Sequence, residues 1–312
     1  MGQQVMERYR LVTRSDFDGL VCAALLKHLG MLDDILFVHP KDMQDGKVAI
    51  TASDITTNLP YVPGVHLAFD HHSSETLRLE DSPSNHVIDP HAKSAARVVY
   101  DHFGGPDTFP TDVISPEMMD AVDKADAALF EPEEILEPHG WTFLSFLMDP
   151  RTGLGRFREF CISNYQLMMQ LIDACTERSV DEILETPDVA ERVALYRAHA
   201  QTAREQLLRC ATVHGRAVVV DLRDEEIIHP TNRFMVYALF PACNISIHVL
   251  WGLRKQNTVF AVGKSIINRS SGVDVGSLML ARGGGGHEAA GTCQVPNERA
   301  AEVRRDLIER LR

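Results

Sequence analysis

The first half of this 312-residue chain alternates short apolar runs with amphipathic segments, and this alternation constrains the fold more than any other feature. The apolar runs predict strands, and apolar residues at helical spacing predict helices that close on Gly30 and Gly104. The predicted strands are residues 9–12, 35–38, 47–50 and 65–69, and the predicted helices are residues 20–30 and 91–104. Strands separated by helices indicate an α/β fold, with a mostly parallel sheet and helices on both faces.

The length of the chain and its later pattern predict a second, smaller domain, since a single core usually stops growing at roughly 250–300 residues. Helical spacing runs from about residue 157 to residue 212, and strand-like runs follow at 216–222, 244–253 and 257–266, with helices near 274–282 and 297–311. The predicted parts are a large domain over 1–160, a helical connector over 161–212 and a smaller mixed α/β domain over 213–312.

Composition and charge exclude several classes of protein. Hydrophobic residues make up 45% of the chain, which is typical of a globular protein, and its apolar runs fall short of the ~20 residues that cross a bilayer. The six cysteines are scattered without a C-x-x-C pair, so we expect reduced thiols. Without a signal-peptide pattern, a cytoplasmic location and no membrane partner are expected. A net charge of −13 argues against binding of long duplex nucleic acid.

Acidic and imidazole side chains follow several of the predicted strands. Asp16 and Asp18 follow the first strand, Asp54 follows the third, and the run Asp70-His71-His72 follows the fourth. In parallel sheets, ligands bind beyond the carboxyl ends of the strands. Each aspartate alone could be a turn or helix-capping residue, and the two histidines alone could be loop residues.

A further pair of carboxylates, Asp123 and Asp126, lies at i, i+3 spacing in a helical segment, so both are expected on one helix face. Taken alone, such a pair usually indicates a solvent-exposed helix face. Together with the residues at the strand ends, however, these carboxylates form the inventory that two divalent cations ~3.5–4 Å apart require for phosphoester hydrolysis. Imidazole ligands shift the preference from Mg²⁺ toward Mn²⁺ or other transition metals.

The order Asp-x-Asp, Asp, Asp-His-His, Asp, followed near the end of the chain by GGGGHEAAG, resembles the DHH phosphoesterase family with its DHH-associated C-terminal domain. The resemblance covers nearly the whole chain and implies two Mn²⁺ ions, with Mg²⁺ as the alternative. It implies that Asp16 binds the first ion and that Asp18, His71 and Asp126 bind the second. Asp54 would bridge the ions and His72 would face the phosphate. Asp126 fits the family's Asp-x-x-x-Phe pattern better than Asp123, which is the alternative ligand.

The chain departs from the family where a ligand of the first ion is expected. Many members have a histidine four residues before the first aspartate, and others have a ligand two residues before it. Here these positions are Val12 and Arg14. Another side chain could substitute (His39, His66 or His91), the first site could be weak, or the guanidinium of Arg14 could supply the positive charge and act in catalysis.

The glycine-rich motif near the C-terminus predicts a substrate-binding element. Gly284, Gly285 and Gly286 would let backbone N–H groups approach an anion, and His287 would begin a helix whose N-terminus favours negative charge. By resemblance, this motif grips the terminal part of the substrate. Arg269 is a candidate phosphate ligand, with Asn268 as the alternative.

The resemblance implies a manganese-dependent hydrolase of short oligonucleotides or phosphorylated nucleotides, with its site in a cleft between the two domains. One alternative is an exopolyphosphatase-like hydrolase of inorganic polyphosphate. Another is a degenerate member that binds a nucleotide as a sensor without cleaving it. The helical connector offers a surface that could support a homodimer.

Overall fold

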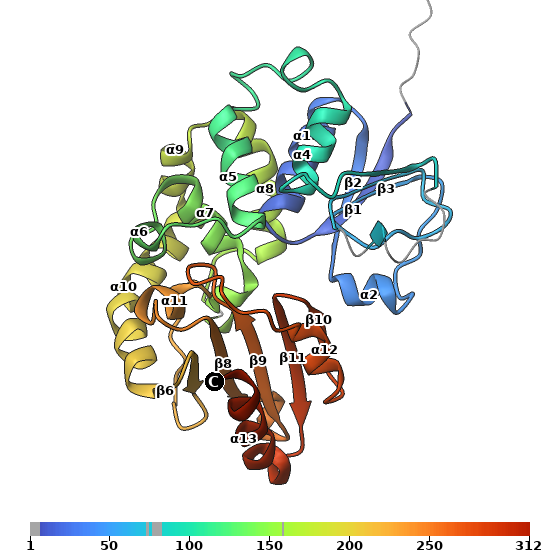
Figure 1. The fold of residues 1–312 in the computed structure, drawn as a ribbon. Coiled ribbons are helices and arrows are strands. Elements are labelled where there is room, and N and C mark those ends of the chain that lie inside the picture. Colours follow the sequence, from blue (N-terminus) through green and yellow to red (C-terminus); the bar gives the residue numbers. More distant parts are fainter. Residues whose placement is uncertain (1–6, 73–74, 77–82, 158) are drawn as a thin grey trace, which may run out of the picture. The chain divides into compact units, whose positions relative to one another are not determined.

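The computed structural model describes residues 7–72, 75–76, 83–157 and 159–312, which divide into two compact units (Figure 1). Unit 1 holds the chain up to Leu129 together with His139–Pro150 and Gly155–Val193, and unit 2 holds Phe130–Pro138, Arg151–Leu154 and Ala194–Arg312. The helical segment 161–212 is thus shared between the units, and the three predicted domain ranges stay a prediction. Among the described residues no helix is both long and apolar enough to cross a membrane.

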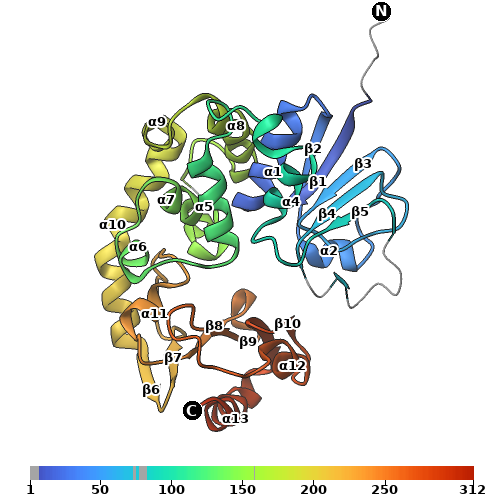
Figure 2. The same cartoon turned by 45° about the horizontal axis from the view of Figure 1, so that its top comes forward.

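Unit 1 is built on a five-stranded parallel sheet with the strand order β2-β1-β3-β4-β5 (Figure 2). The strands are β1 (Tyr9–Arg14), β2 (Leu32–Val38), β3 (Asp54–Thr57), β4 (Leu67–Asp70) and β5 (His86–Ile88). Its helices are α1 (Phe17–His28), α2 (Pro40–Gln44), α4 (Ala95–His102), α5 (Pro116–Asp126), α7 (Gly140–Met148), α8 (Asn164–Glu177) and α9 (Val180–Glu185). The prediction of an α/β fold with a mostly parallel sheet is confirmed.

Helices cover both faces of this sheet because successive side chains of a strand point to opposite faces. On one face, α1 is buried from Phe17 to Leu26. Its start lies so close to the end of β1 that a Cβ on Gly19 would come within 2.1 Å of the carbonyl oxygen of Arg14. On the other face, Met43 of α2 packs against Val12 of β1.

Residues 47–50, which were predicted as a strand, form no strand, and this prediction is wrong. Val48 and Ile50 are instead half-buried against the cluster that contains Val12 and Met43, which explains why the run is apolar. The third strand in sequence begins at Asp54 and is paired with β1 through Arg10↔Asp54 to Thr13↔Thr57. Asp54 therefore lies at the amino end of its strand.

Unit 2 contains a mixed six-stranded sheet with the order β10-β11-β9-β8-β7-β6, as predicted for the second domain. Its strands are β6 (Ala211–His214), β7 (Ala217–Asp221), β8 (Ile245–Trp251), β9 (Thr258–Lys264), β10 (Gly285–His287) and β11 (Ala290–Val295). Its helices are α6 (Pro132–Leu136), α11 (Met235–Leu239), α12 (Val275–Leu280) and α13 (Ala300–Leu311), and α10 (Pro187–Cys210) leads into it from unit 1.

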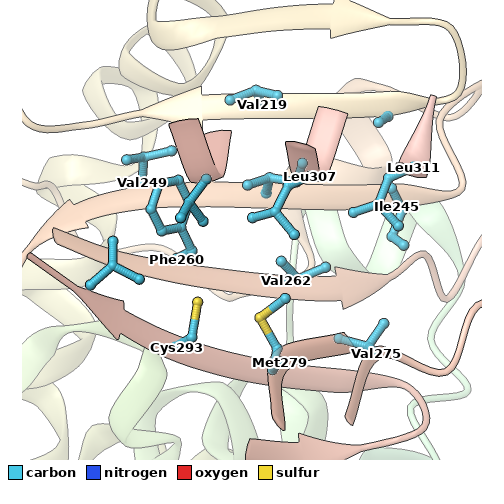
Figure 3. Packing of buried hydrophobic residues seen from close by; sticks show 14 of the residues in the cluster. Val219, Ile245, Val249, Phe260, Val262, Val275, Met279, Cys293, Leu307 and Leu311 are labelled. Carbon is cyan, nitrogen blue, oxygen red and sulfur yellow. The ribbon is translucent and has the colours of Figure 1, made fainter. Parts of the chain in front are cut away.

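The core of unit 2 lies on one face of this sheet (Figure 3). Alternate residues of β8 and β9, among them Val249 and Phe260, point toward Leu307 of α13 and Met279 of α12. Burial of such side chains contributes roughly 1.5–3 kcal/mol each, so the two helices are held to the sheet mainly by apolar contact.

Candidate metal centre

The carboxyl ends of the parallel strands bring several polar residues of unit 1 to one edge of the sheet. In register, Thr13 of β1 lies beside Thr57 of β3, and Thr57 lies beside Phe69 of β4. The residues that follow these positions therefore emerge at the same edge. They are Arg14 and Asp16 after β1, Asn58 after β3, and Asp70 and His71 at the end of β4.

Three side chains converge at this edge with the geometry of a cation site. One oxygen of Asp18, one oxygen of Asp126 and one ring nitrogen of His71 lie within 4.8 Å of one another. Asp18 is on the first turn of α1 and is only 2% exposed. The backbone N–H groups of Ala95 and Ala96, at the start of α4, donate to its two oxygens at 3.0 and 2.7 Å and fix the orientation of its carboxylate.

Burial and crowding perturb the ionisation of these groups. Burial and the nearby carboxylate of Asp126 raise the pKa of Asp18 from 3.8 to about 7. Burial opposes charging of His71, but the close contact with Asp126 outweighs it and raises the pKa of the imidazole to about 9. Two carboxylates crowded in a buried site need a compensating positive charge, which is what a divalent cation provides.

The imidazole of His71 is oriented as a metal ligand would be. Its Nδ1 donates to the carbonyl oxygen of Ala92 at 3.3 Å, which leaves Nε2 to face Oδ2 of Asp126 at 2.8 Å. This contact lacks hydrogen-bond geometry, so Nε2 is buried without a hydrogen-bond partner among the described residues. A backbone acceptor that fixes the tautomer of a histidine is a common feature of metal-ligating histidines. The residues therefore fit a divalent cation held by two carboxylates and one imidazole.

His72 is held by Asp70 rather than by the three-residue group. Its Nδ1 donates to Oδ1 of Asp70 at 2.7 Å, and the same oxygen accepts the backbone N–H groups of His71 and His72. The hydrogen bond to Asp70 raises the pKa of His72 and so favours its cationic form. The His72 side chain is 43% exposed, so this cationic group can meet a ligand.

Arg14 places a permanent positive charge among the carboxylates of this edge. Its Nε lies 3.0 Å from Oδ2 of Asp16. Asp16 also caps α1 by accepting the N–H of Gly19 at 3.0 Å. Burial opposes the charge on Arg14, but the carboxylates of Asp16, Asp126, Asp18 and Asp149 together hold its pKa above the usual value. Arg14 thus belongs electrostatically to the same cluster.

Asp54 does not lie at this edge, so the prediction that it follows a strand there is wrong. It is four residues before Asn58 along an extended strand, a separation of roughly 13 Å at ~3.3 Å per residue. Its oxygens accept from Nε of Arg10 at 2.7 Å and from the backbone N–H and hydroxyl of Thr51 at 2.6 and 3.0 Å. Asp54 therefore has a structural role at the amino end of the sheet.

Asn58, which directly follows β3, lies at the carboxyl edge, and it was not singled out in the sequence analysis. It is 1% exposed, has a φ of 55°, and both polar atoms of its side chain are buried without a hydrogen-bond partner among the described residues. The sequence held one signal for Asn58, which is its position directly after the short strand DITT. It was missed because the third strand was predicted at residues 47–50.

The structure separates Asp126 from its alternative, Asp123. Asp123 accepts from the hydroxyl of Ser94 at 2.7 Å and from Nε of Arg97 at 2.9 Å, which ties α5 to α4. The histidines proposed as substitute ligands are dispersed. His39 caps α2, His66 stacks on Tyr9 at the amino end of β1, and His91 is exposed in the loop next to Ala92.

The glycine-rich motif of unit 2 forms a hairpin, so the predicted helix start at His287 is wrong. β10 pairs antiparallel with β11 through Gly285↔Thr292 to His287↔Ala290. A Cβ on Gly284 would lie 2.1 Å from the carbonyl oxygen of Thr292. Close backbone packing thus requires this glycine.

The other predicted substrate-binding residues also lie in unit 2. Gly285, Gly286 and His287 line a cavity of about 280 Å³ beside α12. Arg269 is exposed, and its Nε donates to the carbonyl oxygen of Ile266 at 3.0 Å. Asn268 donates to the carbonyl oxygen of Ala242, so its amide supports the loop.

No family model matches the chain, and no curated protein matches it. Among solved structures, it resembles a pGpG-specific phosphodiesterase, PggH, from Vibrio cholerae, with 58% identity, a TM-score of 0.86, and coverage of 97% of this chain and 99% of that chain. It also resembles CDC45 from Entamoeba histolytica, with 9% identity, a TM-score of 0.51, and coverage of 97% and 95%. The second likeness is one of fold alone.

Proposed function

The chain belongs to the DHH phosphoesterase family and is a hydrolase of phosphoester bonds, and from this premise we propose that it cleaves short linear dinucleotides such as pGpG with Mn²⁺ as its cation. The observation that carries the proposal is the 58% identity to a pGpG-specific phosphodiesterase over nearly the full length of both chains. The net charge of −13 agrees with a short substrate, since long nucleic acids are held mainly by lysine and arginine contacts to phosphate.

The choice of Mn²⁺ rests on the donor set. Asp18 and Asp126 offer carboxylate oxygens, which suit hard divalent cations, and His71 offers an imidazole nitrogen, which favours Mn²⁺ over Mg²⁺. When bound there, such a cation supplies Lewis acidity to the phosphoryl group. The N–H groups of Ala95 and Ala96 and the carbonyl of Ala92 keep the ligands in place.

Two cationic side chains of this edge are proposed to stabilise the charge that develops on the phosphoryl oxygens. His72 is oriented through Nδ1 by Asp70, so its Nε2–H can donate to a phosphoryl oxygen when the ring is charged. Arg14 offers guanidinium N–H groups beside Asp16. Both groups are fixed before the substrate binds, so they require little reorganisation during the reaction.

In unit 2, we propose that Arg269 and the stretch Gly284–His287 bind the part of the substrate remote from the scissile bond. The exposure of Gly285, Gly286 and His287 around the cavity beside α12 supports this role. Gly284 is also required by the close packing of the hairpin, so its substitution would not test binding alone. Substitution of Gly285, whose Cβ would meet no atom within 4 Å, therefore tests binding without disturbing the hairpin.

The test is a turnover panel with Mn²⁺ that compares pGpG, a longer oligonucleotide, a 3′,5′-bisphosphonucleotide, a cyclic dinucleotide and polyphosphate. The proposal predicts that kcat/KM for pGpG exceeds that for every other substrate by about tenfold or more, a difference of about 1.4 kcal/mol in transition-state binding. Faster turnover of polyphosphate, or binding of pGpG without cleavage, would contradict it. Asp18→Asn serves as the inactive control.

A further inference from the structure

We propose that the centre binds one divalent cation per chain, at Asp18, His71 and Asp126, and that Arg14 supplies the fixed positive charge that a second cation would otherwise bring. The inference rests on the proposed metal-dependent function, because it concerns the same residues. It does not depend on which phosphoester is cleaved.

The charges at the carboxyl edge balance for one divalent cation. The carboxylate of Asp16 is neutralised by the guanidinium of Arg14, whose Nε lies 3.0 Å away. In a cation-bound centre His71 would be neutral, and the carboxylates of Asp18 and Asp126 would be the two negative charges of the three-residue group. One divalent ion cancels these two charges. A second ion would add two positive charges, and of the carboxylates that act on Arg14 only that of Asp149 would remain to offset them.

Asn58 removes the charge that a bridging carboxylate would contribute. Two cations ~3.5–4 Å apart repel each other and need a shared anionic ligand between them. Asn58 occupies the end of β3 between the ends of β1 and β4, and its backbone N–H donates to the carbonyl oxygen of Phe69 at 3.0 Å. Its buried amide has no hydrogen-bond partner among the described residues. An amide oxygen can ligate one cation, but it brings no negative charge.

Arg14 also opposes a second cation directly. A guanidinium cannot ligate a metal and cannot lose its proton in a protein. Asp16, Asp126 and Asp18 all stabilise the charge on Arg14, so its guanidinium lies within electrostatic reach of the proposed ligands. Arg14 stands at a position where the family is expected to have a ligand of the first ion, and it is itself a cation.

Asp70, His71 and His72 form the other group in the described residues whose donor atoms lie within 4.8 Å. Oδ1 of Asp70 is already used by the ring of His72 and by two backbone N–H groups. Oδ2 of Asp70 is buried without a hydrogen-bond partner in the described part of the chain. This group is the rival place for a second ion, so an Asp70→Asn variant belongs in the test.

The test counts Mn²⁺ ions on the full chain without substrate, by isothermal titration after chelator treatment and by metal analysis of the dialysed protein. The expected stoichiometry is one ion per chain. Asp18→Asn is expected to weaken binding at least tenfold, whereas Asp70→Asn and Arg10→Gln are expected to keep one ion. Arg10 lies at the opposite edge of the same sheet, paired with Asp54, and is the matched control for Arg14.

Two variants test the role of Arg14. Arg14→Gln is expected to tighten Mn²⁺ binding about tenfold at low salt, with a smaller gain at high salt because screening weakens the repulsion that is lost. The double variant Arg14→Asp/Asn58→Asp is expected to bind two ions, and its circular dichroism reports whether it is folded.

Two ions on the wild-type chain, or unchanged affinity in Arg14→Gln, would overturn the inference. One bound ion without pGpG cleavage would contradict the proposed function and leave this inference standing.

Discussion

At each edge of the parallel sheet in unit 1, an arginine of β1 pairs with an aspartate, and the two edges use this pair differently. At the amino edge, Arg10 and Thr51 donate to both oxygens of Asp54. At the carboxyl edge, Arg14 contacts Asp16, but Asp18 and Asp126 are left crowded around His71. An aspartate such as Asp54, both of whose carboxylate oxygens accept hydrogen bonds from protein groups, stabilises the fold. An aspartate crowded against another carboxylate indicates a cation site.

The pKa shifts of Asp54 and Asp18 differ in sign. Burial alone would raise the pKa of Asp54, but Arg10 and Thr51 lower it. At the other edge, burial and Asp126 raise the pKa of Asp18 to about 7. Asp18 also accepts two backbone N–H groups, but its burial and the carboxylate of Asp126 outweigh them, whereas the donors of Asp54 outweigh its burial.

The largest effect is expected from exchanging one aspartate for asparagine at each edge. Asp18→Asn removes a proposed metal ligand and should lower kcat/KM for pGpG by about 10³-fold or more, because the cation and its charge stabilisation are lost. Asp54→Asn should leave kcat/KM within about threefold, since Asp54 lies roughly 13 Å from the carboxyl edge. Steady-state kinetics with Mn²⁺ measure both variants. Equal losses in the two variants would remove the distinction between the edges.

A second substitution separates charge stabilisation from metal binding within the carboxyl edge. His72→Gln should lower kcat by about 10²-fold, because a cationic donor to the phosphoryl oxygens is lost. Mn²⁺ affinity should stay unchanged, since His72 is held by Asp70 and not by the three-residue group. A parallel loss of Mn²⁺ affinity, measured by titration calorimetry, would show that His72 is a ligand instead.

The stability of the metal-free protein should depend on pH in opposite directions through Asp18 and Asp54. The folded-state pKa of Asp18 is raised from 3.8 to about 7, so its contribution to stability is present below pH 3.8 and is lost as the pH rises to about 7. His71 acts in the same direction between pH 6.5 and about 9. The lowered pKa of Asp54 contributes stability above pH 3.8, which is lost as the pH falls through its folded-state value.

Thermal unfolding of the chelated protein across this pH range measures these contributions. Relative to wild type, Asp18→Asn should remove the decline in Tm between about pH 4 and 7 and keep the decline above it. Asp54→Asn should flatten only the acid side of the profile. If Asp18→Asn leaves the profile unchanged, the crowding of Asp18 with Asp126 does not exist in solution.

The smallest effect is expected from trimming the support of Asp54. Thr51→Val removes the hydroxyl that donates to Asp54 and accepts the backbone N–H of exposed Ser53, which water can satisfy, but it leaves the Thr51 N–H in place. The loss of one such hydrogen bond lowers the free energy of unfolding by about 1 kcal/mol. Chemical denaturation measures this change, and pGpG turnover should stay at the wild-type level. A clear loss of turnover would mean that the two edges are coupled.

Much of the fold was predictable because the periodic apolar pattern is strong. Strands β1, β4, β8 and β9 and helices α1 and α13 fall within a few residues of the predicted ranges. The same pattern led to the error at residues 47–50, since an apolar run that packs beside a sheet has the composition of a strand within it. The glycine-rich hairpin was missed because β11 pairs with the distant strand β9, a contact that local sequence does not report.

The positions of the candidate site residues could be predicted only where the strands before them were predicted at the right place. Asp16, Asp18 and His71 were predicted at this edge because the predicted strands 9–12 and 65–69 end near the ends of β1 and β4. Asp126, the last residue of α5, was predicted from the resemblance to the family motif. Asp54 was assigned to that edge through the misplaced third strand, which also hid Asn58. The role of Arg14 depends on which carboxylates surround it in space, and spacing along the chain does not give that information.

Anomalous diffraction from crystals grown with Mn²⁺ tests the distinction between the two edges most directly. We expect one manganese peak per chain, within roughly 2.0–2.3 Å of Nε2 of His71 and of one oxygen each of Asp18 and Asp126. No peak is expected near Asp54. A peak at Asp54, a second peak beside Arg14, or the absence of a peak at His71 would contradict the assignment of the carboxyl edge as a one-cation centre.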